Sequence, residues 1–114
     1  MIQQVLQWLV LSGILLACHR PDRTITHGAD DSTAWNRHLR AAIPLGVSSD
    51  SAQAILGRNG FLCRQGRDSV AYLWCDKQSG GTTAVVRRRW QAVLTLDDQG
   101  RISDVRGSTG LIGP

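Results

Sequence analysis

Residues 46–57, GVSSDSAQAILG, mark the point at which the chain changes from helical to strand-like periodicity. Ser48 has a side chain that commonly caps a helix N-terminus, and the sequence predicts a helix from Ser49 to Leu56. Gly57 follows at the position where glycine often ends a helix. The stretch therefore predicts a short capped helix that leads the chain into the β segments after it.

A helical pattern also precedes this stretch, over residues 32–42. Asp31 or Ser32 can cap its start, and Pro44 prevents it from continuing. The apolar residues that recur at helical spacing and would face a core are Trp35, Leu39, Ala42 and Ile43. We therefore predict a first helix from Ser32 to Ala42.

Strand-like alternation follows the second helix. Phe61–Arg64 and Val70–Asp76 predict the two strands of a hairpin, with a turn at Gly66–Asp68. Cys63 and Cys75 lie on the two strands, where a bridge between them could clamp the hairpin. The register that would place them opposite each other is not determined by the sequence.

A longer alternating segment runs from Ala84 to Leu96. Asp97–Gly100 then predicts a type I turn into a last strand from Arg101 to about Arg106. Ile102 and Val105 interrupt strict alternation, so we expect a β-bulge there. The face of the longer segment that we expect to enter the core carries Val86, Trp90, Ala92, Leu94 and Leu96.

Together these elements predict one α+β domain over residues 32–114. Two short helices pack on an antiparallel meander sheet of three or four strands, which is the fold class we expect. Because both helices come before the strands and cover one face of the sheet, the other face would be open.

The N-terminal end of the chain has features of a bacterial lipoprotein signal. An apolar run leads to LLAC at residues 15–18, in which a small residue precedes Cys18. We predict that residues 1–17 are a signal peptide, that Cys18 carries lipid, and that residues 18–31 form a flexible tether. Residues 1–7 hold no Lys or Arg, and the alternative is a buried N-terminal helix that is not cleaved.

The cysteine count supports this prediction. The chain has 3 cysteines, and assigning Cys18 to lipid leaves Cys63 and Cys75 as a pair. The periplasm is oxidising, so we expect a structural disulfide between them. They are too far apart for a CxxC motif and have no histidine at zinc-ligand spacing, so we expect neither a metal site nor a cofactor. In an uncleaved cytosolic chain, both would be reduced core residues.

The charge of the chain points to an anionic partner. It has 13 Lys and Arg against 9 Asp and Glu, a net charge of +4, and all of these residues follow Cys18. Such a balance suits the phosphates of phospholipid or lipopolysaccharide, or an acidic protein. The export signal argues against nucleic acid, which would be the default partner of a basic cytosolic domain.

The basic run at residues 87–89 is the strongest candidate contact surface. Arg87 and Arg89 would share a strand face with Gln91, opposite the core face. Arg88 would point to the core side, unless it lies beyond the helices. Because the planar guanidinium of arginine suits phosphate or carboxylate, anionic lipid headgroups or an acidic protein loop are the expected ligands. The alternative is that these charges only keep an open sheet soluble.

Two aromatic residues of the preceding strand extend this candidate surface. Tyr72 and Trp74 should share one face of their strand. They are either core residues under the helices or an exposed aromatic patch beside the arginines. The register of the strands decides between these alternatives, and the sequence does not supply it.

The sequence shows no recognisable set of catalytic residues. It has no nucleophile elbow, HExxH motif or P-loop, and it contains no glutamate. Asp97–Asp98 is the nearest approach to paired carboxylates, but it lies in an expected turn. We therefore expect a protein that binds rather than an enzyme.

The glycine, capping serine, helix and Leu-Gly ending of residues 46–57 resemble the SmpA/OmlA (BamE-like) family of small outer-membrane lipoproteins. The resemblance covers roughly residues 44–106 and implies a lipid anchor, two short helices and an antiparallel sheet. It also implies a non-enzymatic scaffold role in outer-membrane protein assembly, at the inner leaflet of the outer membrane facing the periplasm. His19 agrees with that location, because an aspartate after the lipidated cysteine would indicate inner-membrane retention.

A second function stays open at the level of sequence. The chain also resembles small disulfide-clamped lipoproteins of other folds in size and location, which leaves open a binding inhibitor of a periplasmic or foreign hydrolase. Ser108–Pro114 would then be an insertable C-terminal segment. A small enzyme is the third alternative, and it would need a pocket in which polar groups converge.

Overall fold

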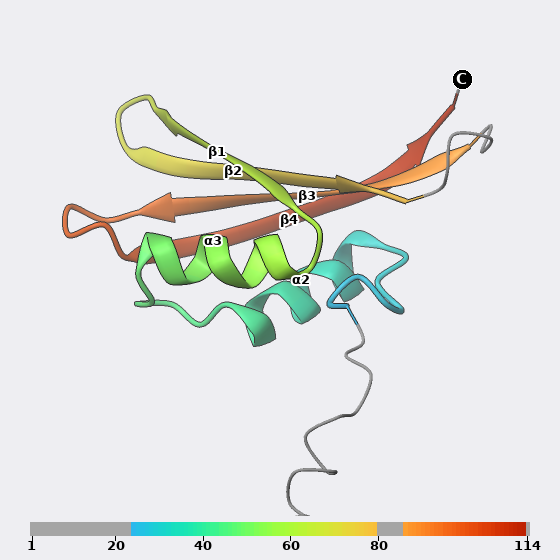
Figure 1. Cartoon of the computed structure of the whole chain (residues 1–114), viewed down its shortest axis with the longest axis horizontal. Helices are drawn as coiled ribbons and strands as arrows, with labels where there is room; N and C mark the ends of the chain where they lie inside the picture. The colour runs from blue at the N-terminus through green and yellow to red at the C-terminus, as the bar shows by residue number, and fades with distance from the viewer. Residues whose placement is uncertain (1–23, 80–85, 114) are drawn as a thin grey trace, which may run out of the picture.

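The computed structural model describes residues 24–79 and 86–113. Figure 1 shows that the helices lie on one side of a sheet, which confirms the predicted α+β class and the open second face. The sheet is an antiparallel meander in the order β1-β2-β3-β4. In chain order, the elements are α2 (Ser32–Ala42), α3 (Ser49–Arg58), β1 (Leu62–Arg67), β2 (Ala71–Gln78), β3 (Arg87–Leu96) and β4 (Ile102–Ile112).

Both helices begin where the sequence predicts. Of the two possible caps of α2, Asp31 is the one used, because its Oδ1 accepts a hydrogen bond of 2.8 Å from the Ala34 N–H. Ser48 caps α3, accepting from the Ser51 N–H at 3.1 Å. These short-range bonds explain why the start of each helix can be read from a few adjacent residues.

The end of α3 differs from the prediction. The helix continues through Gly57 to Arg58, and the glycine with positive φ is Gly60, at +87°. Asn59 is the C-cap, and its side-chain amide donates to the Ile55 carbonyl at 2.8 Å. The predicted end of the helix before Gly57 is therefore wrong, because the C-cap residue, Asn59, lies two positions further on.

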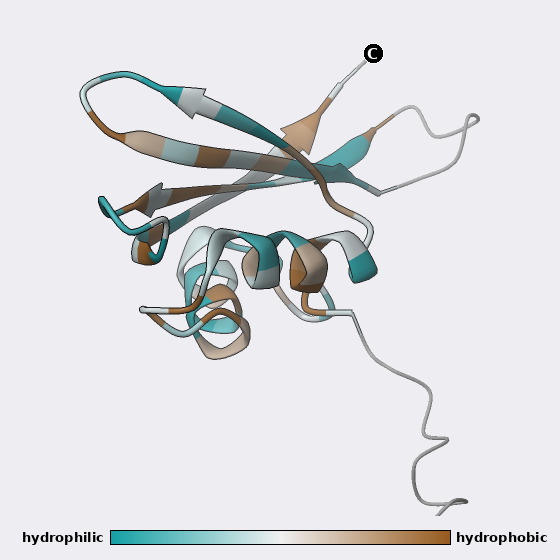
Figure 2. Ribbon diagram, turned by 60° about the vertical axis from the view of Figure 1, so that its left-hand side comes forward, coloured by the Kyte–Doolittle hydropathy of each residue, from teal (hydrophilic) through white to brown (hydrophobic). Residues whose placement is uncertain are grey.

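The core lies between the helices and the covered face of the sheet. Trp35 of α2 is fully buried, its ring stacks on that of Phe61 with centroids 5.5 Å apart, and its indole N–H donates to the Gln91 carbonyl at 2.8 Å. Figure 2 shows the hydropathy alternating along β2, as a half-buried strand requires. The sheet residues buried here include Leu73, Cys75, Trp90, Ala92, Leu94 and Val105.

The predicted core face of β3 is correct over most of its length. Trp90, Ala92 and Leu94 are buried and Leu96 is partly buried. Val86 is wrong as a core residue, because it precedes the first paired residue of β3 and is 53% exposed. The predicted start of this strand at Ala84 lies outside the described residues.

The first hairpin is longer than predicted. Its strands pair from Leu62↔Asp76 to Arg67↔Ala71, so the turn lies at residues 68–70 and Gly66 is inside β1. Cys63 is opposite Cys75, and the two sulfur atoms form the predicted disulfide.

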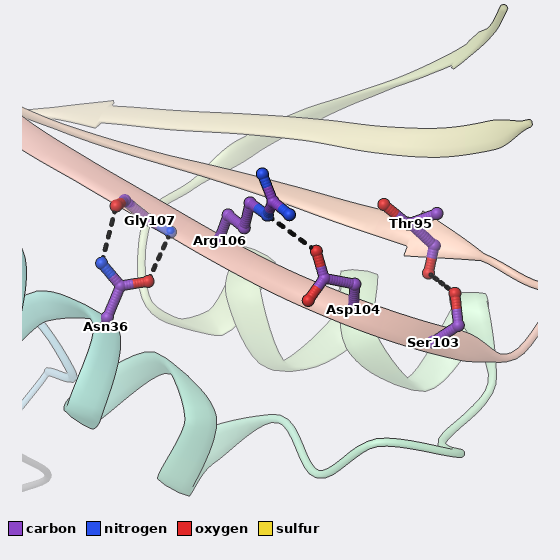
Figure 3. Close-up of polar contacts among 6 residues, drawn as sticks. All are labelled: Asn36, Thr95, Ser103, Asp104, Arg106 and Gly107. Atoms are coloured by element: carbon purple, nitrogen blue, oxygen red, sulfur yellow. Dashed lines mark hydrogen bonds and ion pairs between the residues drawn. The ribbon is translucent and has the colours of Figure 1, made fainter.

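The second hairpin confirms the turn and the bulge. Asp97 closes the turn, because its carbonyl accepts from the Gly100 N–H at 3.0 Å. The pairing then shifts from Thr95↔Asp104 to Leu96↔Ile102, which leaves Ser103 as the extra residue. Ser103 donates to the Thr95 carbonyl at 3.2 Å (Figure 3). The bulge allows Ile102 and Val105, three positions apart, both to face the core.

β4 continues to Ile112, beyond the predicted end at Arg106. Residues 108–112 pair with residues 87–91 of β3. The segment that we considered as an insertable tail is therefore mostly the second half of a strand. Its strand character was missed because Gly107 and Gly110 interrupt the alternation of side chains on which the sequence prediction depends.

The segment Thr24–Asp31, which we expected to belong to a flexible tether, packs against the domain. Ala29 is fully buried, and its carbonyl accepts a hydrogen bond of 2.8 Å from the Trp90 indole. The Ile25 N–H donates to the Asn59 side chain at 2.9 Å. The segment covers the end of the core that the helices leave uncovered, and this contact with a distant strand is not visible in local sequence. Cys18 and the predicted signal peptide lie outside the described residues.

None of the helices among residues 24–79 and 86–113 combines the length and the apolar character needed to cross a bilayer.

Candidate functional site

The candidate site is the open face, which we define as the sheet surface opposite the helices. Cys75 and Ala92 pair with each other and are buried on the covered face. Because side chains alternate along a strand, the residues on either side of each point to the open face. All of the contact residues predicted from sequence lie there, namely Tyr72, Trp74, Arg87, Arg89 and Gln91.

A single row of side chains crosses the centre of the open face. It consists of Arg64, Trp74, Val93 and Arg106, each opposite the next on the neighbouring strand, and we call it the central row. The Arg64 guanidinium carbon lies 4.5 Å from the centroid of the Trp74 ring, a cation–π contact. Val93 is 39% exposed in the middle of the row. The row therefore presents an exposed apolar centre with a cationic group at each end.

Tyr72 lies beside this row and against Gly66 on β1. The two residues are opposite each other, and a Cβ at Gly66 would overlap the Tyr72 ring. The ring therefore lies over the bare backbone of the glycine. Tyr72 and Trp74 are both half-buried on the open face, so they are not core residues under the helices. The arginine in contact with Trp74 is Arg64 rather than one of the 87–89 run.

Two of the open-face arginines are paired with carboxylates. Arg89 donates to Asp76 Oδ2 from Nη2 at 2.8 Å and from Nε at 3.2 Å. Arg106 donates to Asp104 Oδ2 at 2.9 Å, with an Arg106 side chain that is 82% exposed (Figure 3). An exposed pair of this kind contributes little to stability and is readily exchanged for another partner.

The remaining arginines of the open face have no such partner. Neither Arg64 nor Arg87 makes an ion pair within the described residues. The open face therefore has more arginine than aspartate. Among the described residues of this face, the unpaired arginines are Arg64, beside Trp74, and Arg87, the first residue of β3. This distribution favours contact with carboxylates or phosphates.

A hollow of about 240 Å³ lies beside Arg89. It forms because Gly110, opposite Arg89, has no side chain to fill the space. Gln91 and Ser108 line it with polar groups, and Ser108 donates to Gln91 Oε1 at 3.4 Å. Arg89 and Gln91, which the sequence predicted to share a strand face, thus line one depression.

Arg88 faces away from this surface. It lies on the covered side, beyond the helices, and its Nη1 donates to the Asp30 carbonyl at 2.8 Å. This placement agrees with the predicted alternation of the 87–89 run and gives Arg88 a structural role in holding the N-terminal segment.

Sequence reasoning missed the central row as a unit. Arg64, Val93 and Arg106 belong to three strands, and only the pairing register aligns them with Trp74. One signal was present, because a disulfide between Cys63 and Cys75 would already place Arg64 opposite Trp74. The same reasoning cannot reach Arg106, whose register depends on the second hairpin.

The described residues contain no group of three or more histidine, cysteine or acidic residues arranged to hold a metal ion. The chemistry available on the open face is recognition through guanidinium groups, aromatic rings and an apolar centre. Comparison of the chain with protein-family profiles, with curated proteins and with solved structures finds no match.

Proposed function

We propose that this chain is a non-enzymatic, lipid-anchored binding module of the bacterial cell envelope, which holds an acidic protein partner on its open face. The observation that carries the proposal is the central row. Arg64 is held against Trp74, and Val93 lies exposed between Arg64 and Arg106. Interfaces concentrate their binding energy in aromatic and arginine residues of this kind.

The contact between Arg64 and the Trp74 ring strengthens the argument for binding. A long flexible side chain loses rotamer freedom when it binds, which costs about 0.5–1.5 kcal/mol per side chain. Arg64 already lies over the Trp74 ring, so we expect less of this cost to fall on the binding step. Anionic lipid headgroups share the carboxylate's affinity for guanidinium and are the second ligand of this surface.

The proposed address comes from the sequence. Residues 1–17 act as the signal peptide, Cys18 carries the lipid, and the domain faces the periplasm from the inner leaflet of the outer membrane. The disulfide between Cys63 and Cys75 is consistent with an oxidising compartment. The resemblance of residues 46–57 to the SmpA/OmlA family supports a role beside the machinery that assembles outer-membrane proteins.

The address is tested by intact-mass measurement and membrane fractionation of the chain expressed in a Gram-negative host. We expect a triacylated protein that begins at Cys18, and loss of that mass in a Cys18→Ser variant. A soluble, reduced protein that begins at Met1 would contradict the proposal.

The binding role is tested by a photo-crosslinking amino acid at Val93 in the same host. Val93 is exposed at the centre of the open face, and Ala54, exposed on α3, is the matched control on the other side of the domain. We expect a discrete crosslinked envelope protein from position 93 and none from position 54. Equal crosslinking from both positions, or none from either, would remove the open face as the binding surface.

A further inference from the structure

The two edges of the sheet differ in whether their outward backbone groups are hydrogen-bonded. Along β4, the outward backbone groups of Gly107 pair with the Asn36 side chain, and the Thr109 N–H is 3.4 Å from Ser32 Oγ. Nearer the turn, Ile102 exchanges hydrogen bonds of 2.8 Å with the loop before α3. This edge is therefore closed by side chains and loop backbone at Ile102, Gly107 and the Thr109 N–H, which is how folded sheets prevent edge pairing.

The orientation of the opposite edge follows from these bonds. In an antiparallel ladder, paired residues turn their backbone groups alternately toward and away from each other. The backbone N–H and C=O of Gly107 point away from β3. Those of its partner Ala92 therefore point toward β2, where they bond to the backbone of Cys75. The backbone groups of Cys75 therefore point toward β3 and away from β1. Its partner Cys63 in turn directs its backbone N–H and C=O to the outside of the sheet.

The same alternation directs the backbone groups of Gln65 and Arg67 outward. Within the described residues, no hydrogen bond is made to the outward backbone groups of Cys63, Gln65 or Arg67. Gln65 and Arg67 are exposed. Figure 1 shows the β1–β2 hairpin bending away from the helices toward its turn. β1 thus presents a short strand edge that is ready to accept another strand.

A cleft lies directly beside this edge on the covered side of the hairpin. Its volume is about 560 Å³. Its walls include Ser49 and Asp50 at the start of α3, Gln65 and Arg67 of β1, Ala71 of β2 and Leu96 of β3. A strand added to β1 would direct every second side chain toward this cleft and the others toward the open face.

The charge of β1 indicates the kind of strand that fits. β1 contains Arg64 and Arg67 and no acidic residue, and neither arginine is in an ion pair of the described residues. A side chain added opposite Arg64 would lie on the open face next to its guanidinium. Pairing with a second copy of the chain would bring the arginines of both β1 strands together, which is electrostatically unfavourable.

We propose that β1 accepts an extended acidic segment of a protein partner as an additional strand, with acidic side chains beside Arg64 and small apolar side chains in the cleft. The inference rests on the proposed binding role and names the way in which the partner docks. Backbone hydrogen bonds supply affinity in such strand addition, and the alternating side chains supply specificity.

The test uses the full-length protein in detergent and a fluorescent peptide of alternating valine and aspartate, compared with its valine–lysine counterpart. We expect the aspartate peptide to bind at least about tenfold more tightly, and its affinity to fall as salt is raised. Gln65→Pro removes an outward N–H without removing a bond to β2, and we expect it to weaken binding by at least about tenfold.

Arg64→Glu is the second variant, and it tests the charge without altering the backbone. It should reverse the preference so that the lysine peptide binds more tightly, while Arg37→Glu, an equal change of charge at an exposed position of α2 outside the open face, should change neither affinity. Thermal melting and disulfide content check the fold of each variant. Equal binding of the two peptides, unchanged binding in both Gln65→Pro and Arg64→Glu, or a dimer through β1 that excludes the peptide would overturn the inference. Crosslinking at Val93 that persists when strand addition fails would leave the proposed function standing.

Discussion

The side-chain amide of Asn36 pairs with both backbone polar groups of Gly107. Its Nδ2 donates to the Gly107 carbonyl at 2.8 Å, and the Gly107 N–H donates to its Oδ1 at 2.8 Å (Figure 3). Gly107 lies in the edge strand β4, so one residue of α2 supplies the hydrogen bonds that a further strand would supply. The contact both holds α2 on the sheet and closes this edge.

Replacement of Asn36 by alanine tests this contact. Both backbone groups of Gly107 would lose their partner, and we expect the free energy of unfolding to fall by about 1–3 kcal/mol. Urea denaturation of the domain measures the change. Arg37→Ala, an exposed change on the same helix, should alter stability by less than about 0.5 kcal/mol. Equal effects of the two variants would show that the amide pairing contributes nothing specific.

Gly107 and Gly110 make a matched pair for a second prediction. A Cβ at Gly107 would lie 2.6 Å from Trp35 Cδ1 and Nε1, whereas one at Gly110 would have no atom within 4 Å. Gly107→Ala should therefore displace Trp35 and destabilise the domain by about 1–3 kcal/mol. Gly110→Ala should be neutral within about 0.5 kcal/mol. Denaturant midpoints compare the two, and a neutral Gly107→Ala would show that α2 can move without cost.

Reduction of the disulfide is expected to lower stability. Cys63 and Cys75 are separated by 12 positions, and a loop of this order gives about 2–4 kcal/mol of stabilisation. For a domain of this size, that corresponds to a decrease in melting temperature of about 10 °C or more. Melts with and without reductant measure it, and the Cys63→Ser, Cys75→Ser double variant should match the reduced protein. An unchanged melt with two titratable thiols would contradict the prediction.

The docking of the N-terminal segment gives a further prediction. Ala29 is fully buried over Trp90, so Ala29→Asp should destabilise the domain by at least about 2 kcal/mol, because an unpaired carboxylate would enter the core. Asp30→Ala is the control, since only the Asp30 backbone carbonyl is used, by Arg88. Tryptophan fluorescence during urea unfolding follows both. If the Ala29→Asp variant unfolded like the parent, the segment would be dispensable.

Much of the secondary structure could be predicted because the interactions that determine it are local. The cap of α3 joins Ser48 to a residue three positions away, and the turn before β4 joins Asp97 to Gly100. The bulge was predictable from Ile102 and Val105, whose spacing is incompatible with regular alternation. Arg87, Arg89 and Gln91 share the open face as predicted, since alternation alone determines which residues of a single strand point the same way.

The sequence by itself thus determined the α+β class, the helix starts, the turn at Asp97–Gly100 and the pairing of Cys63 with Cys75. The tertiary structure decided the face on which Tyr72 and Trp74 lie, the alignment of Arg64 with Arg106, the extension of β4 and the docking of Thr24–Asp31. These features depend on contacts such as that of Asn36 with Gly107, 71 positions apart. No pattern among neighbouring residues encodes such contacts, because they form only when the packed core brings a helix, a strand and a terminal segment to the same place.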